Sequence, residues 1–215
     1  MTQEARFSRL EPELRKANLI EATLTCLKLY GFQGASIRKI SAQAGVSVGL
    51  INHHYCGKDE LVAEAYLSIT GRVLGLLRGA VEAAPPGARP RLSAFFNGSF
   101  CPELLDPQLL DAWLAFWGAV KTAEAINQAH EHSYGEYRAV LRDVLIELAA
   151  EEGWQAFDAE LAAISLSALL DGLWLESGLN PGTFSPAQGI QICEAWVDGL
   201  QAGGHKRFCE STNNC

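Results

Sequence analysis

An all-α protein is predicted by the pattern of apolar and helix-ending residues along this chain of 215 residues. Apolar residues recur at helical spacing through most of the sequence. Runs of alternating β-branched residues and Asn-Gly or Asp-Gly hairpin turns are missing from it. Proline and glycine interrupt the periodic stretches at Ala84–Pro90 and at Asn180–Pro186. About nine helices are therefore expected, with short ones first and long ones after.

Each expected helix has its own start and stop signals. Gly31 is suited to end the first helix, since glycine adopts the left-handed conformation of a C-cap. Ser36 and Ser47 are N-cap candidates for two short helices, and Gly45 ends the first of these two. The expected helices span residues 13–30, 36–44, 47–54, 58–83, 91–101, 107–121, 123–152, 158–178 and 186–202.

Composition predicts an ordinary globular protein in the cytoplasm. Hydrophobic residues make up 48% and charged residues 20% of the chain, and the mean hydropathy is +0.04. The longest apolar stretches fall short of the roughly 20 residues that a membrane span needs, and the N-terminus has no apolar signal-peptide core. The six cysteines form no CxxC pair, so free thiols are expected.

The net charge of −8 is unevenly distributed between the two ends of the chain. Residues 1–60 contain eight Lys or Arg against six Asp or Glu, whereas residues 61–215 contain nine against nineteen. An acidic body with a mildly basic N-terminal part suits a protein that meets phosphate through one end.

A helix-turn-helix is predicted within Ala35–Val62, where two helices of about eight residues flank a tight turn. Gly45 supplies the turn conformation that other residues resist. The apolar residues that are spaced to pack the two helices together are Ile37, Ile40, Ala44, Val46, Leu50 and Ile51.

This stretch resembles the N-terminal DNA-binding domain of the TetR family. The family pattern is a Ser or Thr, an Ile, the block Ala-Gly-Val-Ser, then Gly, Tyr, and a Lys before a Leu. The matching residues here are Ser36, Ile40, Ala44, Gly45, Val46, Ser47, Gly49, Tyr55, Lys58 and Leu61. Cys56 and Gly57 depart from the pattern, near where the family usually has a Phe. The resemblance implies a homodimeric repressor that binds a near-palindromic double-stranded operator.

Recognition-helix geometry assigns roles to individual residues of this domain. Val48 is placed to contact a thymine methyl, Asn52 to pair with adenine, and His53 to reach a base or phosphate. The residues suited to phosphate are Ser36, Ser47, Tyr55 and Lys58, with Arg38 and Lys39 flanking the same surface. A second interpretation of Tyr55, as a core residue that only grazes DNA, stays open. A metal pair of His53 and His54 is disfavoured, because adjacent residues on a helix point apart.

The expected domains are a DNA-binding domain at residues 1–60, a helical ligand-binding and dimerisation domain at 61–203, and a flexible tail at 204–215. The pocket and the dimer interface are implied by the family resemblance. The last two helices have broad apolar faces that suit either a four-helix bundle between subunits or the core of one subunit. The residues of these faces are Leu161, Ile164, Leu166, Leu169, Leu170, Leu173, Trp174, Ile190, Ile192, Cys193, Trp196, Val197 and Leu200.

A ligand site for a quaternary ammonium is predicted from Trp113, Trp117, Asp171 and Trp174. Trp113 and Trp117 are four residues apart and therefore lie on one helix face, and Trp174 follows Asp171 by three. A quaternary ammonium has no N–H to donate, so aromatic faces and a nearby anion recognise it best. Alternatively, the tryptophans belong to the core, and Asp171 pairs with Arg138 or Arg142 or caps a group across the dimer.

The segments Trp113–Trp117 and Leu170–Leu175 also resemble the BetI subgroup, which responds to choline-like ligands and controls choline and glycine betaine metabolism. A TetR-type repressor for another cation, a lipid or an aromatic compound is the alternative. An enzyme is disfavoured, since the P-loop, GxGxxG, GxSxG and HExxH motifs do not occur. No metal or cofactor is expected.

Overall fold

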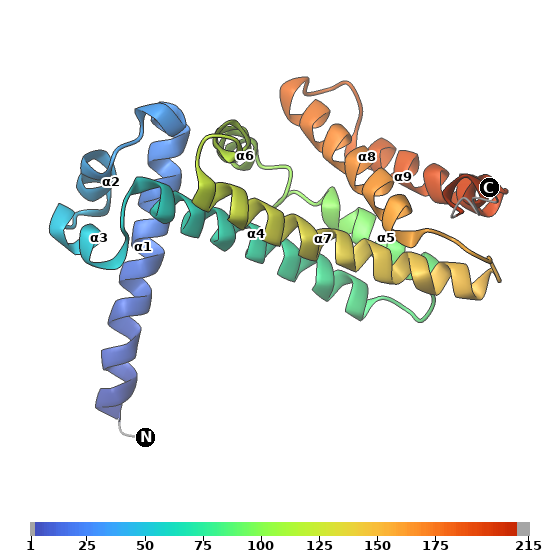
Figure 1. Ribbon diagram of the computed structural model, residues 1–215, viewed down its shortest axis with the longest axis horizontal. Helices are drawn as coiled ribbons and strands as arrows, with labels where there is room; N and C mark the ends of the chain where they lie inside the picture. Colours follow the sequence, from blue (N-terminus) through green and yellow to red (C-terminus); the bar gives the residue numbers. More distant parts are fainter. Residues whose placement is uncertain (1–2, 210–215) are drawn as a thin grey trace, which may run out of the picture. The chain divides into compact units, whose positions relative to one another are not determined.

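The structure, a computed structural model, describes residues 3–209, and the side-chain environments of residues 14–106 and 109–209 within them. The described chain is helical almost throughout (Figure 1). Its elements are α1 (Gln3–Gly34), α2 (Ile37–Ala44), α3 (Val48–His54), α4 (Lys58–Ala83), α5 (Ala88–Ser99), α6 (Pro107–Val120), α7 (Glu124–Glu151), α8 (Ala159–Leu179), α9 (Pro186–Gln201) and the 3-10 helix η1 (Gly204–Phe208).

The predicted all-α class is confirmed, and the first helix shows the largest difference from its expected bounds. Helix α1 begins at Gln3, because glutamine, glutamate, alanine and arginine favour a helix without requiring an apolar face. Gly31 interrupts it with φ 62° and ψ 176°, and the backbone is helical again through Gly34. The predicted stop is therefore a kink.

The helices group into two compact units, which are described separately. The first unit contains residues up to Gly71 together with Asp111–Ser133, and the second contains Arg72–Leu110 and the chain from Tyr134 onward. The division thus falls inside α4 and α7, whereas the expected boundary lay at residue 60. The first turns of α4 carry the fully buried Leu61, Val62 and Tyr66, which bind them into the first unit.

In the first unit, α1, α2 and α3 form the small bundle coloured blue to cyan in Figure 1. Ile40 of α2 and Ile51 of α3 are both completely buried, with Leu27 of α1 beside them in the core. Gly45 takes φ 66° at the turn between α2 and α3, as predicted. Asn18 donates from Nδ2 to the carbonyl of Ala44 at 3.0 Å, which fastens α1 to the end of α2.

A buried aromatic cluster holds α4, α6 and α7 together within the first unit. Tyr66 is fully buried and meets Trp113 and Phe116 edge to face, at ring-centroid distances of 5.3 and 5.0 Å. Its hydroxyl lies 2.8 Å from Nδ1 of His130. One turn further along α4, the Thr70 hydroxyl lies 2.9 Å from that of Ser133. Polar atoms buried in this apolar contact are thereby paired.

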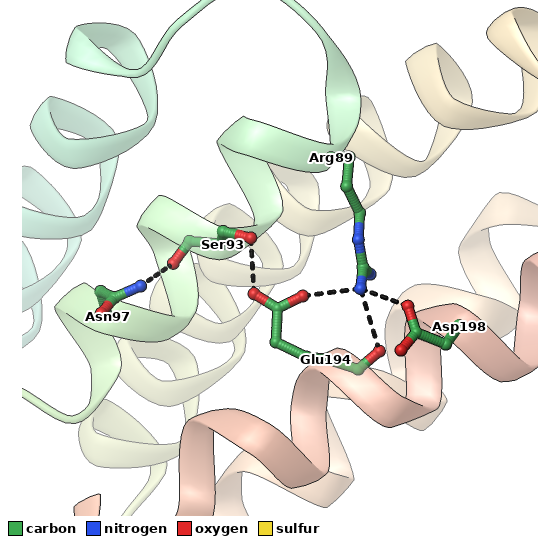
Figure 2. A network of polar contacts seen from close by, with 5 residues as sticks. All are labelled: Arg89, Ser93, Asn97, Glu194 and Asp198. Carbon is green, nitrogen blue, oxygen red and sulfur yellow. Dashed lines mark hydrogen bonds and ion pairs between the residues drawn. The ribbon is translucent and has the colours of Figure 1, made fainter. Parts of the chain in front are cut away.

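In the second unit, a polar network fastens α5 to α9 at the edge of the core (Figure 2). The Arg89 guanidinium pairs with both Glu194, at 2.8 Å, and Asp198, and it also donates to the Glu194 carbonyl. Ser93 donates to the same Glu194 carboxylate. Near the start of α9, Gly189 lies close to the Phe100 ring, and only a hydrogen atom fits between them.

Helix α8 is long and apolar enough to cross a membrane by length and composition alone. A core helix passes the same test, and one face of α8 packs into the core of the second unit through Ala162, Leu166 and Leu170. The apolar side chains that it leaves exposed, together with one on α9, are Leu161, Ile164, Leu179 and Ile192. Some apolar residues of these helices therefore lie in the subunit's own core, and others are exposed on a face that suits contact with a second copy.

The segment from residue 204, expected to be a flexible tail, is described as far as residue 209. Residues Gly204–Phe208 form η1 and pack back onto the second unit. The ring of His205 stacks on Trp154 at 4.4 Å, and the Asp158 amide donates to the Phe208 carbonyl. Aromatic burial thus orders a segment whose polar composition suggested otherwise. Residues 210–215 of the expected tail lie outside the described residues.

Gly189→Ala is expected to lower the free energy of unfolding by about 1–3 kcal/mol, because the added Cβ would meet the Phe100 ring at 2.6 Å. The control is Gly79→Ala on α4, where nothing lies within 4 Å of the added carbon. It is expected to raise stability by about 0.5–1 kcal/mol through helix propensity. Denaturant unfolding of both variants measures the change in the free energy of unfolding. Equal changes for the two variants would exclude the close approach of Gly189 to the Phe100 ring.

Candidate functional site

The two short helices of the first unit are both capped as predicted. The Ser36 hydroxyl accepts from the Lys39 amide at 3.3 Å, and the Ser47 hydroxyl accepts from the Leu50 amide at 3.1 Å. Ser41 adds a bond from its hydroxyl to the Val46 carbonyl at 2.6 Å, across the turn. Each capping hydroxyl accepts in these bonds, so its own hydrogen stays available for an outside acceptor such as a phosphate.

Helix α3 presents one polar face to solvent, as a recognition helix requires. Val48, Asn52 and His53 are exposed, whereas Ile51 is completely buried against the rest of the unit. Val48 is 37% exposed although it is apolar, which leaves a methyl-sized contact surface at the start of the helix. Base-edge readout in a major groove needs this combination of exposed amide, imidazole and apolar groups on one short helix.

The two lysines expected at or beside the DNA phosphates, Lys39 and Lys58, both contact the end of α1. Lys39 donates from Nζ to the Gly34 carbonyl at 2.8 Å and lies over the Tyr30 ring at 3.9 Å. Lys58 donates to the Phe32 carbonyl at 2.9 Å and lies 3.9 Å from the centre of the Phe32 ring. These contacts use only part of each ammonium group, which has three donors, and they fix where the charge lies.

Tyr55 follows the last turn of α3 and is half-buried. This burial is compatible both with a contact to phosphate and with a core residue that only grazes DNA. Burial raises the pKa of Tyr55, and the nearby carboxylate of Glu64 adds to the rise, so the hydroxyl stays a neutral donor. In the described part of the chain this hydroxyl has no hydrogen-bond partner. Arg38 is exposed on α2, which leaves its charge open to solvent.

Asp171 of the second unit is half-buried in the middle of α8 and accepts a hydrogen bond from the Tyr134 hydroxyl at 2.8 Å. Burial raises the pKa of Asp171 to about 6, although the Tyr134 bond and the positive charge of Arg138 act in the opposite direction. Of the two partners considered, Arg142 instead pairs with Asp143 and Glu160. Tyr134, which the sequence did not indicate, is the hydrogen-bond partner.

The four residues predicted to form the ligand site divide between the two units. Trp113 and Trp117 lie in the first unit with their ring centres 6.2 Å apart, and Trp113 also packs on Tyr66. Trp174 lies with Asp171 in the second unit, where its indole donates to the Leu104 carbonyl at 2.8 Å. All three tryptophans are half-buried, so each packs against its neighbours over part of its surface.

The residues around Asp171 that sequence reasoning missed come mainly from α7. Tyr134, Tyr137 and Arg138 follow one another at spacings of three and one, so a helix brings them to one side. Burial, and then the charge of Asp171, raises the pKa of Tyr137 well above its ordinary value. The aromatic and basic pattern was visible in the sequence, but nothing in it indicated which helix α7 faces.

Comparisons with known proteins agree with this geometry. The sequence model for bacterial regulatory proteins of the TetR family matches residues 19–65, and the model for the C-terminal part of BetI-type transcriptional repressors matches residues 88–202. The chain belongs to the TetR family. Its C-terminal part is of the BetI type.

Individual relatives cover nearly the whole chain. The transcriptional regulator BetI of Vibrio parahaemolyticus is 33% identical over 86% of this chain and 88% of its own. A transcriptional regulator of Pseudomonas aeruginosa PAO1, known from a crystal structure, is 77% identical with a TM-score of 0.91, and covers 96% of this chain and 100% of its own. A Saccharomonospora viridis regulator, solved in complex with choline, is 19% identical with a TM-score of 0.70 over 85% and 95%, and shares the fold.

TetR-family regulators bind operator DNA, dimerise and respond to small-molecule effectors, and this chain is accordingly a transcriptional regulator and not an enzyme. The helix-turn-helix described above is the family's DNA-binding element. Among the residues with described placement, no three His, Cys, Asp or Glu side chains gather as a metal site.

Asn52→Ala is expected to weaken operator binding by about 1–3 kcal/mol, because a bidentate amide contact to a base is worth that much discrimination. Binding to unrelated duplex DNA should change little, since phosphate contacts carry that affinity. Fluorescence anisotropy with an operator selected from a random duplex library measures both. Asn97→Ala on α5, also an exposed helical Asn, is the control, and equal losses for the two variants would contradict the assignment.

The raised pKa of Asp171 predicts how stability depends on pH. Between its ordinary value near 4 and the folded value of about 6, the folded state binds more protons than the unfolded state. Stability should therefore rise as pH falls from about 6.5 to 4, and the ionised group should cost up to about 3 kcal/mol above pH 7.

Asp171→Asn removes this charge while keeping an acceptor for Tyr134, so it should raise the thermal midpoint at pH 7.5 and flatten the pH dependence. The exposed Asp143→Asn is the matched control and should leave the dependence in place. Thermal unfolding at fixed protein concentration measures both variants, and a lower midpoint for Asp171→Asn would show that the ionised carboxylate is stabilising.

Proposed function

We propose that this protein is a cytoplasmic, homodimeric repressor that binds a near-palindromic operator and changes its DNA affinity when a quaternary ammonium compound of the choline type binds at Asp171. The genes it controls would then belong to choline and glycine betaine metabolism. The observation that carries the ligand class is the half-buried carboxylate of Asp171, which lies among aromatic side chains and has no ion-pair partner in the described chain.

The DNA-binding half of the proposal is supported by the surface of α2 and α3. Val48, Asn52 and His53 are exposed and suited to bases. The residues suited to phosphates are the exposed Arg38, Lys39 and Ser47 and the half-buried Ser36, Tyr55 and Lys58. In a dimer two copies of this surface would read half-sites about one helical turn apart, roughly 34–36 Å. The exposed apolar residues of α8 and α9 supply a face for the second subunit.

The ligand half of the proposal follows from what a buried carboxylate needs. Burial disfavours the ionised form of Asp171, and a single tyrosine bond does not compensate for it. A cation without N–H groups would stabilise the charge through the carboxylate and through ring faces, each worth about 0.5–2 kcal/mol. Trp174 and Tyr134 provide such rings in the second unit, to which Asp171 also belongs.

A repressor of the same family that responds to a different compound is the alternative function. It keeps the DNA-binding assignment and replaces the effector with another cation, a lipid or an aromatic compound. The position of Asp171 favours the cation, because a lipid chain would leave the buried carboxylate without compensation.

The proposal is tested by thermal unfolding with choline, betaine aldehyde, glycine betaine, tetramethylammonium and unrelated amphiphiles. A ligand of the folded state raises the midpoint by mass action, and we expect a shift selective for trimethylammonium compounds. In calorimetry Asp171→Asn should weaken binding about tenfold or more, since it removes a charge partner, whereas Asp143→Asn should match the wild type.

Operator affinity measured with and without the ligand completes the test. If the ligand changes the affinity for DNA, linkage requires that it bind the DNA-bound and the DNA-free protein with different affinities. A shift caused only by a compound of another class would remove the choline-type assignment and leave the alternative repressor. Binding of choline with unchanged affinity in Asp171→Asn would exclude this carboxylate as the site.

A further inference from the structure

Arg138 lies in the neighbourhood of Asp171, and one donor of its guanidinium group has no partner. Its Nε atom is buried and has no hydrogen-bond partner. The guanidinium lies over the Tyr134 ring at 5.8 Å from the ring centre, and Tyr134 donates its hydroxyl to Asp171. Two opposite charges therefore flank one tyrosine, and in the described chain they form no ion pair with each other.

Buried donors without partners are rare in native proteins, because each costs roughly 1–3 kcal/mol and more when charged. Arg142 on the same helix is paired with Asp143 and Glu160, and among the buried side-chain donors of the described chain only Nη1 of Arg89 likewise lacks a partner. The Tyr137 hydroxyl, three residues after Tyr134, also makes no hydrogen bond to a described residue. An acceptor from outside the chain would satisfy both donors.

We propose that Arg138 and Asp171 are the two poles of one site for a zwitterion, a quaternary ammonium that also carries a carboxylate. The cation of the ligand lies at Asp171, and its carboxylate accepts from Arg138 and Tyr137. The inference rests on the proposed recognition of a quaternary ammonium at Asp171 and narrows its class. A methylated amino acid fits this description, whereas a simple monocation leaves Arg138 without a partner and adds repulsion.

The charge balance of the site supports the narrower class. Asp171 and Arg138 carry opposite charges at pH 7, so the two-pole site is neutral, and a zwitterion is neutral as well. Each pole of the ligand then meets a single opposite charge in a partly dehydrated place, where such contacts are stronger than in water. A guanidinium also binds a carboxylate better than it binds a hydroxyl, because its planar donors reach both carboxylate oxygens.

Calorimetry of the full-length protein with three probes tests the proposal. Glycine betaine carries a trimethylammonium and a carboxylate, choline carries a hydroxyl in place of the carboxylate, and tetramethylammonium has no second group. Wild-type protein is expected to bind glycine betaine about ten- to a hundredfold tighter than tetramethylammonium, as charged hydrogen bonds would give.

Arg138→Met should remove this preference and leave tetramethylammonium affinity within about twofold, or slightly improved by the loss of repulsion. Arg138→Lys keeps the charge without the planar fork and should retain part of the preference, which keeps the test valid if the Met variant fails to fold. Arg142→Met, on the same helix and paired elsewhere, should match the wild type.

The outcomes separate this inference from the proposed function. Binding of choline and tetramethylammonium without a preference for glycine betaine would overturn the zwitterion site and leave a choline-type regulator. An unchanged preference in Arg138→Met would overturn the role of Arg138. Binding of none of the three probes would overturn the ligand class and this inference together.

Discussion

The cost of burying charge in an apolar helical body is the constraint on which the second unit depends. Asp171 directly follows the buried Leu170 on α8, and its charge has one hydrogen bond from Tyr134 to replace the water it has lost. The apolar core formed by residues of α5, α7, α8 and α9, which includes the neighbouring Leu170, offsets that cost when the chain folds. The cation proposed to bind there would recover part of this free energy, which would contribute to its affinity.

Helix α7 connects this charge to the part of the chain that carries the DNA-binding residues. In the first unit its His130 and Ser133 are paired with Tyr66 and Thr70 of α4, and in the second unit its next residue, Tyr134, bonds Asp171. If α7 slid along α4, the buried hydroxyl and imidazole groups would be left unpaired, at roughly 1–3 kcal/mol each. Discrete positions of α7 are therefore favoured over gradual ones, which is what a two-state response requires.

The sequence predicted the fold and the local geometry of the helix-turn-helix much better than the surroundings of Asp171. Helix periodicity, the caps Ser36 and Ser47 and the turn at Gly45 act over a few residues, so local reasoning found them. The partner of Asp171 lies 37 residues away on another helix, and only tertiary packing brings Tyr134 to it. The order in η1 has the same origin, because the stacking of His205 on Trp154 joins segments far apart in sequence. Spacing within one helix could not reveal either contact.

A ligand bound at Asp171, as proposed above, would also be linked to subunit association through α8. Ile164 is 41% exposed, and Asp171 follows it by seven residues, which is close to two helical turns, so the two side chains project from nearly the same side. TetR-family proteins dimerise, and the exposed apolar residues of α8 suit that contact. A second subunit packed there would remove more water from the neighbourhood of Asp171 and raise the cost of its charge. The dimer would then bind a neutralising cation more tightly than the free subunit does, and by linkage the ligand would stabilise the dimer to the same extent.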